Sequence, residues 1–209
     1  MTKLYKLTDK NGQTYGGMQW GEDVTHCAPG NGELCSATYI HAYTHPLLAV
    51  LLNPIHAKFS DPILWESDGV VEKEDKGLKV GCTRLTTMKK IEIPNITTTQ
   101  NIAFAILCAK AVCSSFEWNK WADDWLDGID RTEFAADVAA KATWAVVQSL
   151  PRIGGPQAEA AKWAAIAAKW AAQDRLSIME HWTAATAVEA LFAKVVDLGK
   201  LAEYAVANY

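Results

Sequence analysis

The chain has 209 residues, half of them hydrophobic, and a formal net charge of −4. This length and this apolar content predict one large domain or two small ones with a substantial core, and they exclude a largely disordered chain. No basic cluster is larger than the pair Lys89 and Lys90. That pattern argues against binding to nucleic acid, because such binding needs a concentrated positive surface.

The sequence also bears on the cellular compartment. The longest apolar run, residues 102–112, contains Lys110 and is too short to span a bilayer. Residues 1–6 lack the apolar run of a signal peptide. The five cysteines are odd in number, and no two of them have the CxxC spacing. We therefore expect a cytoplasmic protein with reduced thiols and no membrane segment.

The character of the sequence changes near residues 97–99. The part before this point is rich in Gly, Pro and Thr and holds four of the five histidines, whereas the part after it is rich in alanine and holds seven of the nine tryptophans. We expect an α+β fold with two domains. Residues 1–96 are predicted to form a small mixed β-sheet module with a short helix, packed on an Ala/Trp-rich helical bundle formed by residues 97–209.

The sheet module begins with an expected strand at residues 4–7. The tetrad from Asp9 to Gly12 is a turn signal, so residues 13–20 are expected to return as its partner strand. Glycines and a proline in residues 21–34 predict a loop. Pro46 is expected to open a short helix that ends near residue 56. The other expected strands are residues 37–44, 63–66 and 70–72, with a turn at Asp68-Gly69 between the last two, and residues 78–85 and 89–93.

The second domain has helical periodicity throughout. Asp130, with Glu133 three residues later, resembles a capping box. Trp118, Trp121 and Trp125 share one helical stripe, which we interpret as core rather than as an oligomer interface. The expected helices are residues 98–114, 116–126, 130–148, 157–172 and 174–208, with a loop at 151–156 and a possible break at Gly199.

One face of the strand at residues 37–44 is the best candidate for ligand contact. Alternation along that strand places Tyr39, His41 and Tyr43 on the same side. Such side chains can stack on a ring and hydrogen-bond to it. A nucleotide would also need partners for its ribose and phosphates. The candidates for those contacts are Trp65 and Glu66 at a strand end, and Lys79 and Arg84 on a later strand.

Other site chemistries find little support in the sequence. His41 and His45 are four residues apart, but they lie in an extended stretch before Pro46 instead of on a helix, so no metal site is expected. No GxSxG, GxGxxG or Walker motif occurs. We therefore expect neither a catalytic nucleophile nor a bound cofactor.

Several segments between residues 39 and 94 resemble an N-terminal module of uncharacterised proteins from tailed phages and prophages, in which an alanine-rich helical region often follows. The resemblance implies a phage accessory protein, and many of these are counter-defence factors. One class binds and sequesters cyclic or ADP-ribose-derived immune nucleotides of the host, usually as a symmetric oligomer. The segments that carry the resemblance are Tyr39-Ile40-His41-Ala42-Tyr43, His45-Pro46-Leu47-Leu48-Ala49, Leu64-Trp65-Glu66 and Lys79-Val80-Gly81-Cys82-Thr83-Arg84-Leu85.

The leading expectation is therefore a homo-oligomer, assembled through its helices, that captures a small nucleotide-like ligand without catalysis. Two alternatives remain open. The order His26, Tyr39, Glu66 is similar to that of ADP-ribosyltransferase-like modules, which implies an enzyme using NAD, with His26 holding the dinucleotide and Glu66 orienting the ribose. The third possibility is an inhibitor that binds a host defence protein through the helical face and takes no small ligand.

Overall fold

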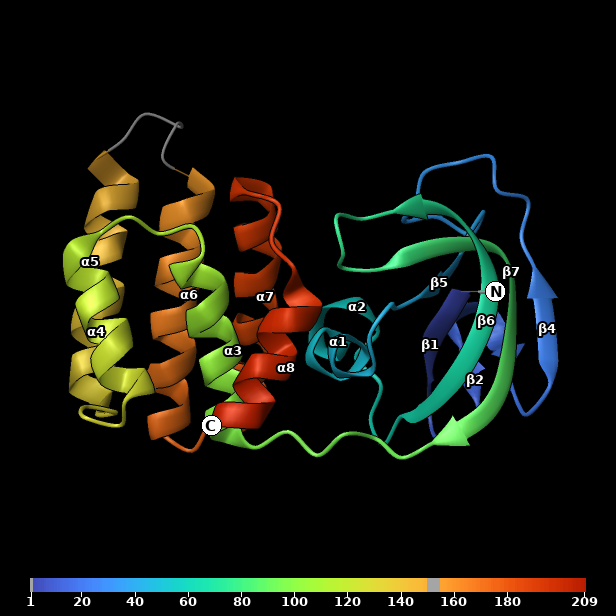
Figure 1. Cartoon of the computed structure of the whole chain (residues 1–209), viewed down its shortest axis with the longest axis horizontal. Helices are drawn as coiled ribbons and strands as arrows, with labels where there is room; N and C mark the ends of the chain where they lie inside the picture. Colours follow the sequence, from blue (N-terminus) through green and yellow to red (C-terminus); the bar gives the residue numbers. More distant parts are fainter. Residues whose placement is uncertain (1, 150–154) are drawn as a thin grey trace. The chain divides into compact units, whose positions relative to one another are not determined.

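The computed structural model describes residues 2–149 and 155–209, except for the side chains of residues 144–149 and 177. The chain divides into two compact units, Met1–Asn95 and Ile96–Tyr209 (Figure 1). The first unit is built around an antiparallel sheet, and the second is helical in the part that the structure describes. The α+β fold class is thereby confirmed.

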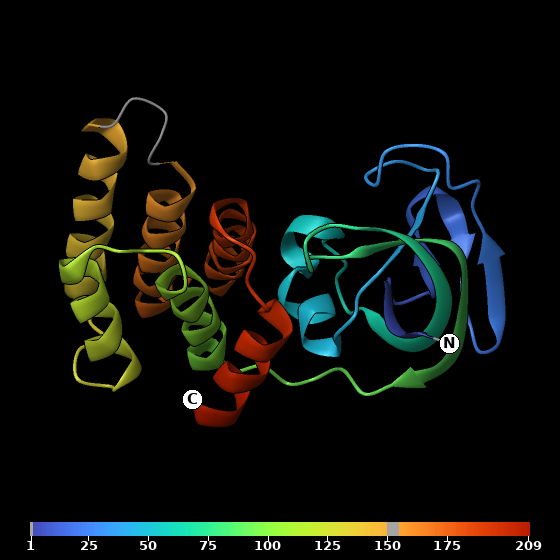
Figure 2. The same cartoon turned by 45° about the horizontal axis from the view of Figure 1, so that its top comes forward.

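The sheet of the first unit has the order β1-β6-β7-β4, and β5 pairs with β7 beside β4. All pairings among the described strands are antiparallel, so the expectation of a mixed sheet is wrong. The long hairpin of β6 and β7 bends strongly (Figure 2), as expected from the three register shifts between them, because β-bulges curve a strand. The strands are β1 (Thr2–Thr8), β4 (Val24–Cys27), β5 (Ile40–Ala42), β6 (Ile63–Glu74) and β7 (Val80–Ile91).

The turn after β1 forms, but the predicted hairpin does not. The Asp9 carboxylate accepts hydrogen bonds from the backbone N–H groups of Asn11 and Gln13, which closes the turn. The chain beyond it then folds on itself as β2 (Gln13–Thr14) and β3 (Met18–Gln19), which pair with each other around a short 3₁₀ turn. β1 pairs instead along its whole length with β6, which is distant in sequence.

The predicted turn at Asp68-Gly69 is also wrong, because both residues lie within the continuous strand β6. A Cβ atom at Gly69 would lie 2.8 Å from the carbonyl oxygen of Arg84 and 2.8 Å from a methyl group of Leu85. Glycine is needed here because the β7 backbone comes so close. The actual turn follows β6, where Gly77 adopts a φ of 97°.

Other boundaries in the first unit differ from those predicted. Residues 21–34, expected as a loop, contain β4, and the strand expected at residues 37–44 is reduced to β5. The short helix is split in two, α1 (Pro46–Leu51) and α2 (Asn53–His56), and Pro46 opens the first as expected. One cluster in the core of the unit consists of Leu4, Trp20, Ile40, Ala42, Val80, Cys82 and Leu85.

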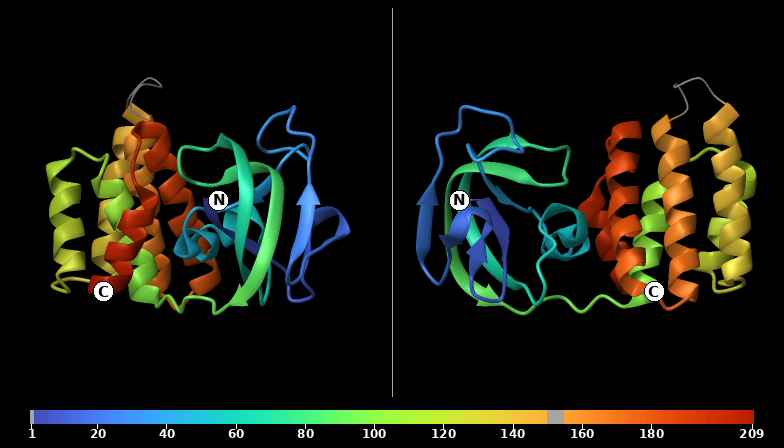
Figure 3. Two further views of the ribbon diagram at one scale, coloured as in Figure 1. Left: turned by 45° about the vertical axis from the view of Figure 1, so that its right-hand side comes forward. Right: turned by 180° about the vertical axis from the view of Figure 1, so that it is seen from behind.

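The helices of the second unit form two layers. α6 lies between α5 and α7, while α3 lies between α4 and α8 and packs on α6 and α7 (Figure 3). Buried alanines along α6 remove bulk from its surface, so neighbouring helices approach closely. In the part of the chain that the structure describes, no helix has both the length and the apolar composition of a membrane span. The helices are α3 (Thr98–Lys110), α4 (Phe116–Leu126), α5 (Glu133–Ser149), α6 (Gly155–Ala172), α7 (Leu176–Ala193) and α8 (Leu198–Asn208).

The tryptophan stripe of α4 is core, as interpreted from the sequence. Trp118, Trp121 and Trp125 are only 2%, 9% and 3% exposed. The indole N–H of Trp118 donates to the carbonyl oxygen of Ala161 on α6, at 3.0 Å. The helix has the predicted bounds because Ser115 caps its N-terminus through the backbone N–H of Trp118.

Two other helix boundaries show how local hydrogen bonds decide where a helix begins. At α5 the capping role expected of Asp130 belongs to Thr132, whose hydroxyl accepts from the N–H of Ala135. The last two helices are separated by residues 194–197 and not at Gly199, because Asp197 caps α8 and places that glycine in its first turn. The loop expected at residues 151–156 lies mostly outside the described residues.

Candidate functional site

The predicted ligand face of the sheet is closed by its own side chains. Tyr39 and Tyr43 are each 6% exposed. The Tyr39 hydroxyl donates to the carbonyl oxygen of Gly30 at 2.5 Å, and the Tyr43 hydroxyl shares a hydrogen bond of 3.2 Å with Nδ1 of His56. Both rings therefore belong to the core of the unit, and the expectation of an open stacking face is not met.

The remaining predicted ligand residues do not converge either. Trp65 is buried, and its indole N–H donates to the Thr8 hydroxyl at 3.1 Å. Lys79 lies 3.9 Å from the Asp75 carboxylate in the turn between β6 and β7. Arg84 is exposed in the middle of β7, opposite residues of β6 and β4. Ring and phosphate partners are thus not brought together on this sheet.

The sheet unit does gather basic side chains around His41. The Lys6 ammonium donates to the backbone carbonyl of His41 at 2.7 Å, and burial lowers the pKa of Lys6 to about 8. Burial, together with the charges of Lys79 and His41, lowers the pKa of His56 to about 4. Burial also lowers the pKa of His41, whose Nε2 donates to the carbonyl of Leu34. These groups have partners inside the unit, which is typical of structural side chains.

The residues of the enzyme alternative are also apart. His26 lies opposite Leu85 on one side of β7, whereas Glu66 lies opposite Lys89 on the other side. Two strand spacings across and four residues along the sheet separate their Cα atoms by about 16 Å. The Glu66 carboxylate is paired with Lys3 at 3.1 Å.

Among the described residues, no three His, Cys, Asp or Glu side chains are grouped so as to hold a metal ion.

Among the described residues, the helical unit, which the sequence had indicated as scaffold, contains a larger and a smaller groove. The larger, here called the α4–α5 groove, has a volume of about 870 Å³ and is lined by residues 112–115, α4, the first half of α5 and the start of α6. The smaller, the α5–α7 groove, has a volume of about 480 Å³ and is lined by α5, α6 and α7. Both volumes are within the range of small-molecule sites, about 300–1,000 Å³.

The α5–α7 groove has a positively charged end. Asp137 of α5 accepts from Lys141, one turn later on the same helix, and from Lys169 of α6, each at 2.6 Å. Hydrogen bonds from Lys141 and Lys169 hold the pKa of Asp137 below its usual range. Because one carboxylate faces two ammonium groups, a net positive charge remains at this end of the groove.

The other wall of the α5–α7 groove is aromatic. Trp182 of α7 lies against Trp163 with ring centroids 4.2 Å apart and planes nearly parallel, and Trp170 of α6 also lines the groove. The third lysine of the lining, Lys162, is 2.5 Å from the carboxylate of Glu159, so it adds little net charge. The remaining lining residues are alanine and isoleucine. The groove thus combines a cationic end with two indole side chains: Trp182 has one face against Trp163, and Arg175 lies 5.1 Å from the ring centre of Trp170.

The α4–α5 groove has the opposite charge. Its walls include Trp118 and Trp121 of α4 and Phe134 of α5. Glu117, Asp124 and Asp130 bring three carboxylates to its lining, against the single lysine Lys120. An anionic ligand is therefore disfavoured here by like charge, and the two grooves of the helical unit suit different partners.

The chain matches no protein-family model, and neither a curated protein nor a solved structure is significantly similar to it. Function is therefore inferred from the chemistry of the sites.

The spacing of Lys162, Ile166 and Lys169 along one helical face was the available sequence signal for the smaller groove. No local pattern could add Lys141 of α5 or Trp182 of α7 to it, because they come from other helices.

Proposed function

We propose that this protein captures, without catalysis, a small anionic ligand that carries a planar ring, such as a nucleotide, in the α5–α7 groove. The observation that carries the proposal is the convergence of Lys141 and Lys169 on one carboxylate, beside the indole rings of Trp170 and Trp182. The proposal keeps the ligand class expected from the sequence but moves its site from the sheet to the helices.

The cationic end is suited to a phosphate group. The Lys141 side chain is 77% exposed and that of Lys169 is 29% exposed. Both can turn from Asp137 toward an anion, because a lysine ammonium is a flexible point charge on a long stem. A phosphate placed between Lys141 and Lys169 would share their two ammonium groups with Asp137. It would pair with the positive charge that the single carboxylate of Asp137 does not neutralise.

The aromatic end is suited to a base. Stacking on indole rings requires only a planar π-surface, so it favours a purine or pyrimidine without specifying which one. α5 and α7 lie on opposite sides of α6, so the axes of these two helices are about 16–20 Å apart. A ligand that reaches from Lys141 to Trp182 is therefore elongated, and ADP-ribose, which has two phosphates, is a more suitable probe than a mononucleotide.

Binding without turnover is favoured by the composition of the lining. The described residues of the α5–α7 groove include no histidine, cysteine, serine, threonine or tyrosine, and the one carboxylate is held by two lysines. The groups left for proton transfer or nucleophilic attack are Asp137 and the lysines, and these are engaged in ion pairs. Capture of an intact ligand is also what the resemblance of residues 39–94 to phage modules implies, since a sequestered immune nucleotide needs no conversion.

The test is calorimetric titration of the full-length protein with ADP-ribose, AMP, adenosine and inorganic phosphate. We expect ADP-ribose to bind, AMP to bind more weakly, and adenosine and phosphate to bind least, because each of the last two offers only one of the two recognised groups. The variants K141Q and K169Q should each weaken ADP-ribose binding about tenfold, the usual scale of one lost charged contact. K200Q, which changes an exposed lysine of α8, is the matched control.

Two results would contradict the proposal. One is equal affinity of K169Q and the unchanged protein for ADP-ribose, with K200Q also unchanged. The other is equal affinity for adenosine and ADP-ribose, which would show that charge plays no part. Recovery of the bound probe by heat denaturation separates capture from turnover, because a captured probe is released with its original mass.

A further inference from the structure

We propose that the α4–α5 groove is the docking site for a positively charged amphipathic helix of a partner protein. This inference concerns a different surface from the nucleotide proposal and does not depend on it. It rests on three features of the groove: an exposed apolar wall, an acidic lining and a length suited to a helix.

The α5 side of the apolar wall is exposed to solvent. Phe134 and Val138, one turn apart on α5, are 78% and 50% exposed. They face the groove together with Trp118 and Trp121 of α4. Large apolar side chains gathered in one groove mark an interaction surface, whereas single exposed ones are ordinary.

The wall also contains an unused hydrogen-bond donor. The indole N–H of Trp121 is buried and has no acceptor among the residues that the structure describes. Buried polar groups normally have partners. The α4 side of the groove is therefore not saturated by contacts within the described part of the chain.

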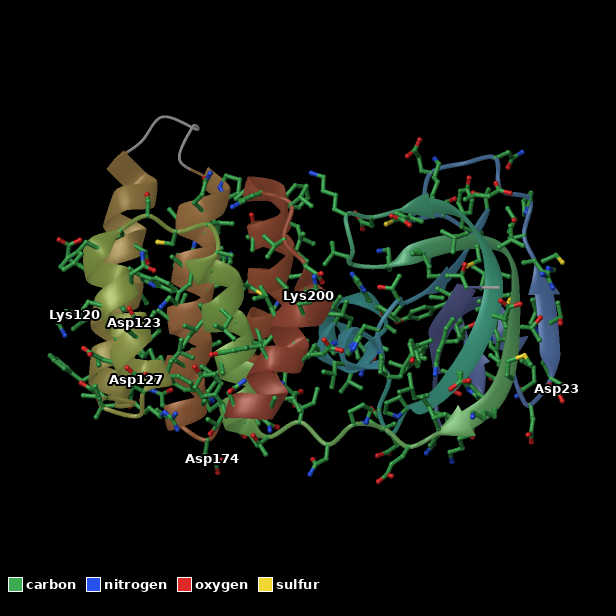
Figure 4. All side chains as sticks on the ribbon, viewed as in Figure 1. Asp23, Lys120, Asp123, Asp127, Asp174 and Lys200 are labelled. Atoms are coloured by element: carbon green, nitrogen blue, oxygen red, sulfur yellow. The ribbon has the colours of Figure 1, made fainter. Side chains whose placement is uncertain are left out.

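The charge of the lining selects the sign of the partner. Asp124 accepts from Lys120 at 2.7 Å, which neutralises that pair, while Glu117 and Asp130 remain at the groove. Hydrogen bonds from Thr132 hold the pKa of Asp130 below its usual value, so its carboxylate is ionised at neutral pH. Asp123 and Asp127, labelled in Figure 4, lie outside the lining of the groove, and Asp123 is paired with Lys110.

The same charge argues against a second copy of this chain as the occupant. A twofold interface places the same patch on both partners, so an interface through this groove would bring its carboxylates near their own copies. The whole chain has a net charge of −4, which adds long-range repulsion. Basic residues along the edges of an apolar helix face would instead complement the acidic lining.

The dimensions suit a short helix. α4 has 11 residues, which corresponds to about 16 Å or three turns. A partner helix of that length presents apolar side chains at positions i, i+3 or i+4, and i+7, the usual pattern of a helix bound in a groove. Its remaining faces are free to carry the lysines or arginines that meet Glu117 and Asp130 at the groove.

The experiment uses the full-length protein and a fluorescently labelled helical peptide of about 14 residues, roughly four turns, made only of leucine and lysine. A peptide with glutamate in place of lysine is its control. We expect the Leu/Lys peptide to bind, with an affinity that falls as salt is added, and the Leu/Glu peptide not to bind. Fluorescence anisotropy measures both.

Variants locate the binding. F134S should weaken the Leu/Lys complex about tenfold through lost apolar contact, and the double variant E117Q/D130N should weaken it to a similar extent and flatten its salt dependence. The control E74Q/E92Q removes the same number of exposed carboxylates from the sheet unit. Circular dichroism confirms that each variant is folded.

The proposal is overturned if neither peptide binds, if both bind equally, or if F134S and E117Q/D130N bind as tightly as the control. It is also overturned if the protein dimerises and F134S abolishes the dimer, since the occupant would then be a second copy. Titration of the same variants with ADP-ribose keeps the two proposals separate, because loss of peptide binding should leave ADP-ribose binding unchanged.

Discussion

Lys6 offers the sharpest test of the energetics of the sheet unit. Its side chain is buried, its ammonium donates to the carbonyl of His41 at 2.7 Å, and it lies 5.2 Å from the ring centre of Trp20. Burial disfavours the charged form, so the pKa falls from 10.5 to about 8. The ammonium is therefore held in the fold at a cost, and that cost depends on pH.

The sign and the size follow from proton linkage. Between the folded pKa and the unfolded pKa, the unfolded chain binds more protons at Lys6, so stability rises with pH through this window. With pKa values of about 8 folded and 10.5 unfolded, the gain from pH 7 to pH 9.5 is about 2 kcal/mol. The variant K6M has a side chain of similar length that does not titrate. Its unfolding free energy therefore lacks the rise with pH that Lys6 causes.

The assay is urea denaturation of the unchanged protein and of K6M at several pH values, followed by circular dichroism. Between pH 7 and pH 9.5, the unfolding free energy of the unchanged protein should rise by about 2 kcal/mol relative to that of K6M. Other titrating groups cancel in the comparison. A difference that stays constant with pH would refute the reasoning, because it would mean that Lys6 is as well solvated in the folded protein as in the unfolded chain.

Two further predictions concern packing and thiol chemistry. G69A should destabilise the protein by about 1–3 kcal/mol in urea denaturation, because the new Cβ would meet the backbone of Arg84. G155A, where a Cβ meets nothing within 4 Å, is its control. Equal stabilities of the two variants would contradict the packing role of Gly69. Burial raises the pKa of Cys82 to about 11 and that of Cys108 further. Mass spectrometry after mild alkylation at neutral pH should therefore find both thiols unmodified, while the exposed thiols react. Rapid labelling of Cys82 or Cys108 without denaturant would contradict this prediction, because it would show that the core opens.

The sequence alone determined the features that depend on neighbouring residues. The α+β class and the start of α1 at Pro46 follow from composition and from local geometry. The bounds of α4 and the burial of Trp118 follow from a cap and from a stripe with helical period. Capping, proline geometry and amphipathic periodicity act over a few residues, so they can be recognised without knowledge of the rest of the chain.

Only the tertiary structure decided which strands pair and which side chains are available to a ligand. Asp68-Gly69 has the composition of a turn, yet the close approach of β7 makes Gly69 a packing position. Tyr39 and Tyr43 alternate as an exposed face would, yet both are buried. Strand partners are selected by burial and by backbone hydrogen bonds between distant segments, which the local pattern does not contain.

The two grooves show the same limit in the helical unit. Lys141 of α5 meets Lys169 of α6 at Asp137 because these helices pack side by side. Phe134, on another face of α5, belongs to the groove with α4. The sequence determines which residues share a face of one helix, but the helix that faces it depends on how the whole unit packs. Sites built from several helices therefore emerge only with the tertiary structure.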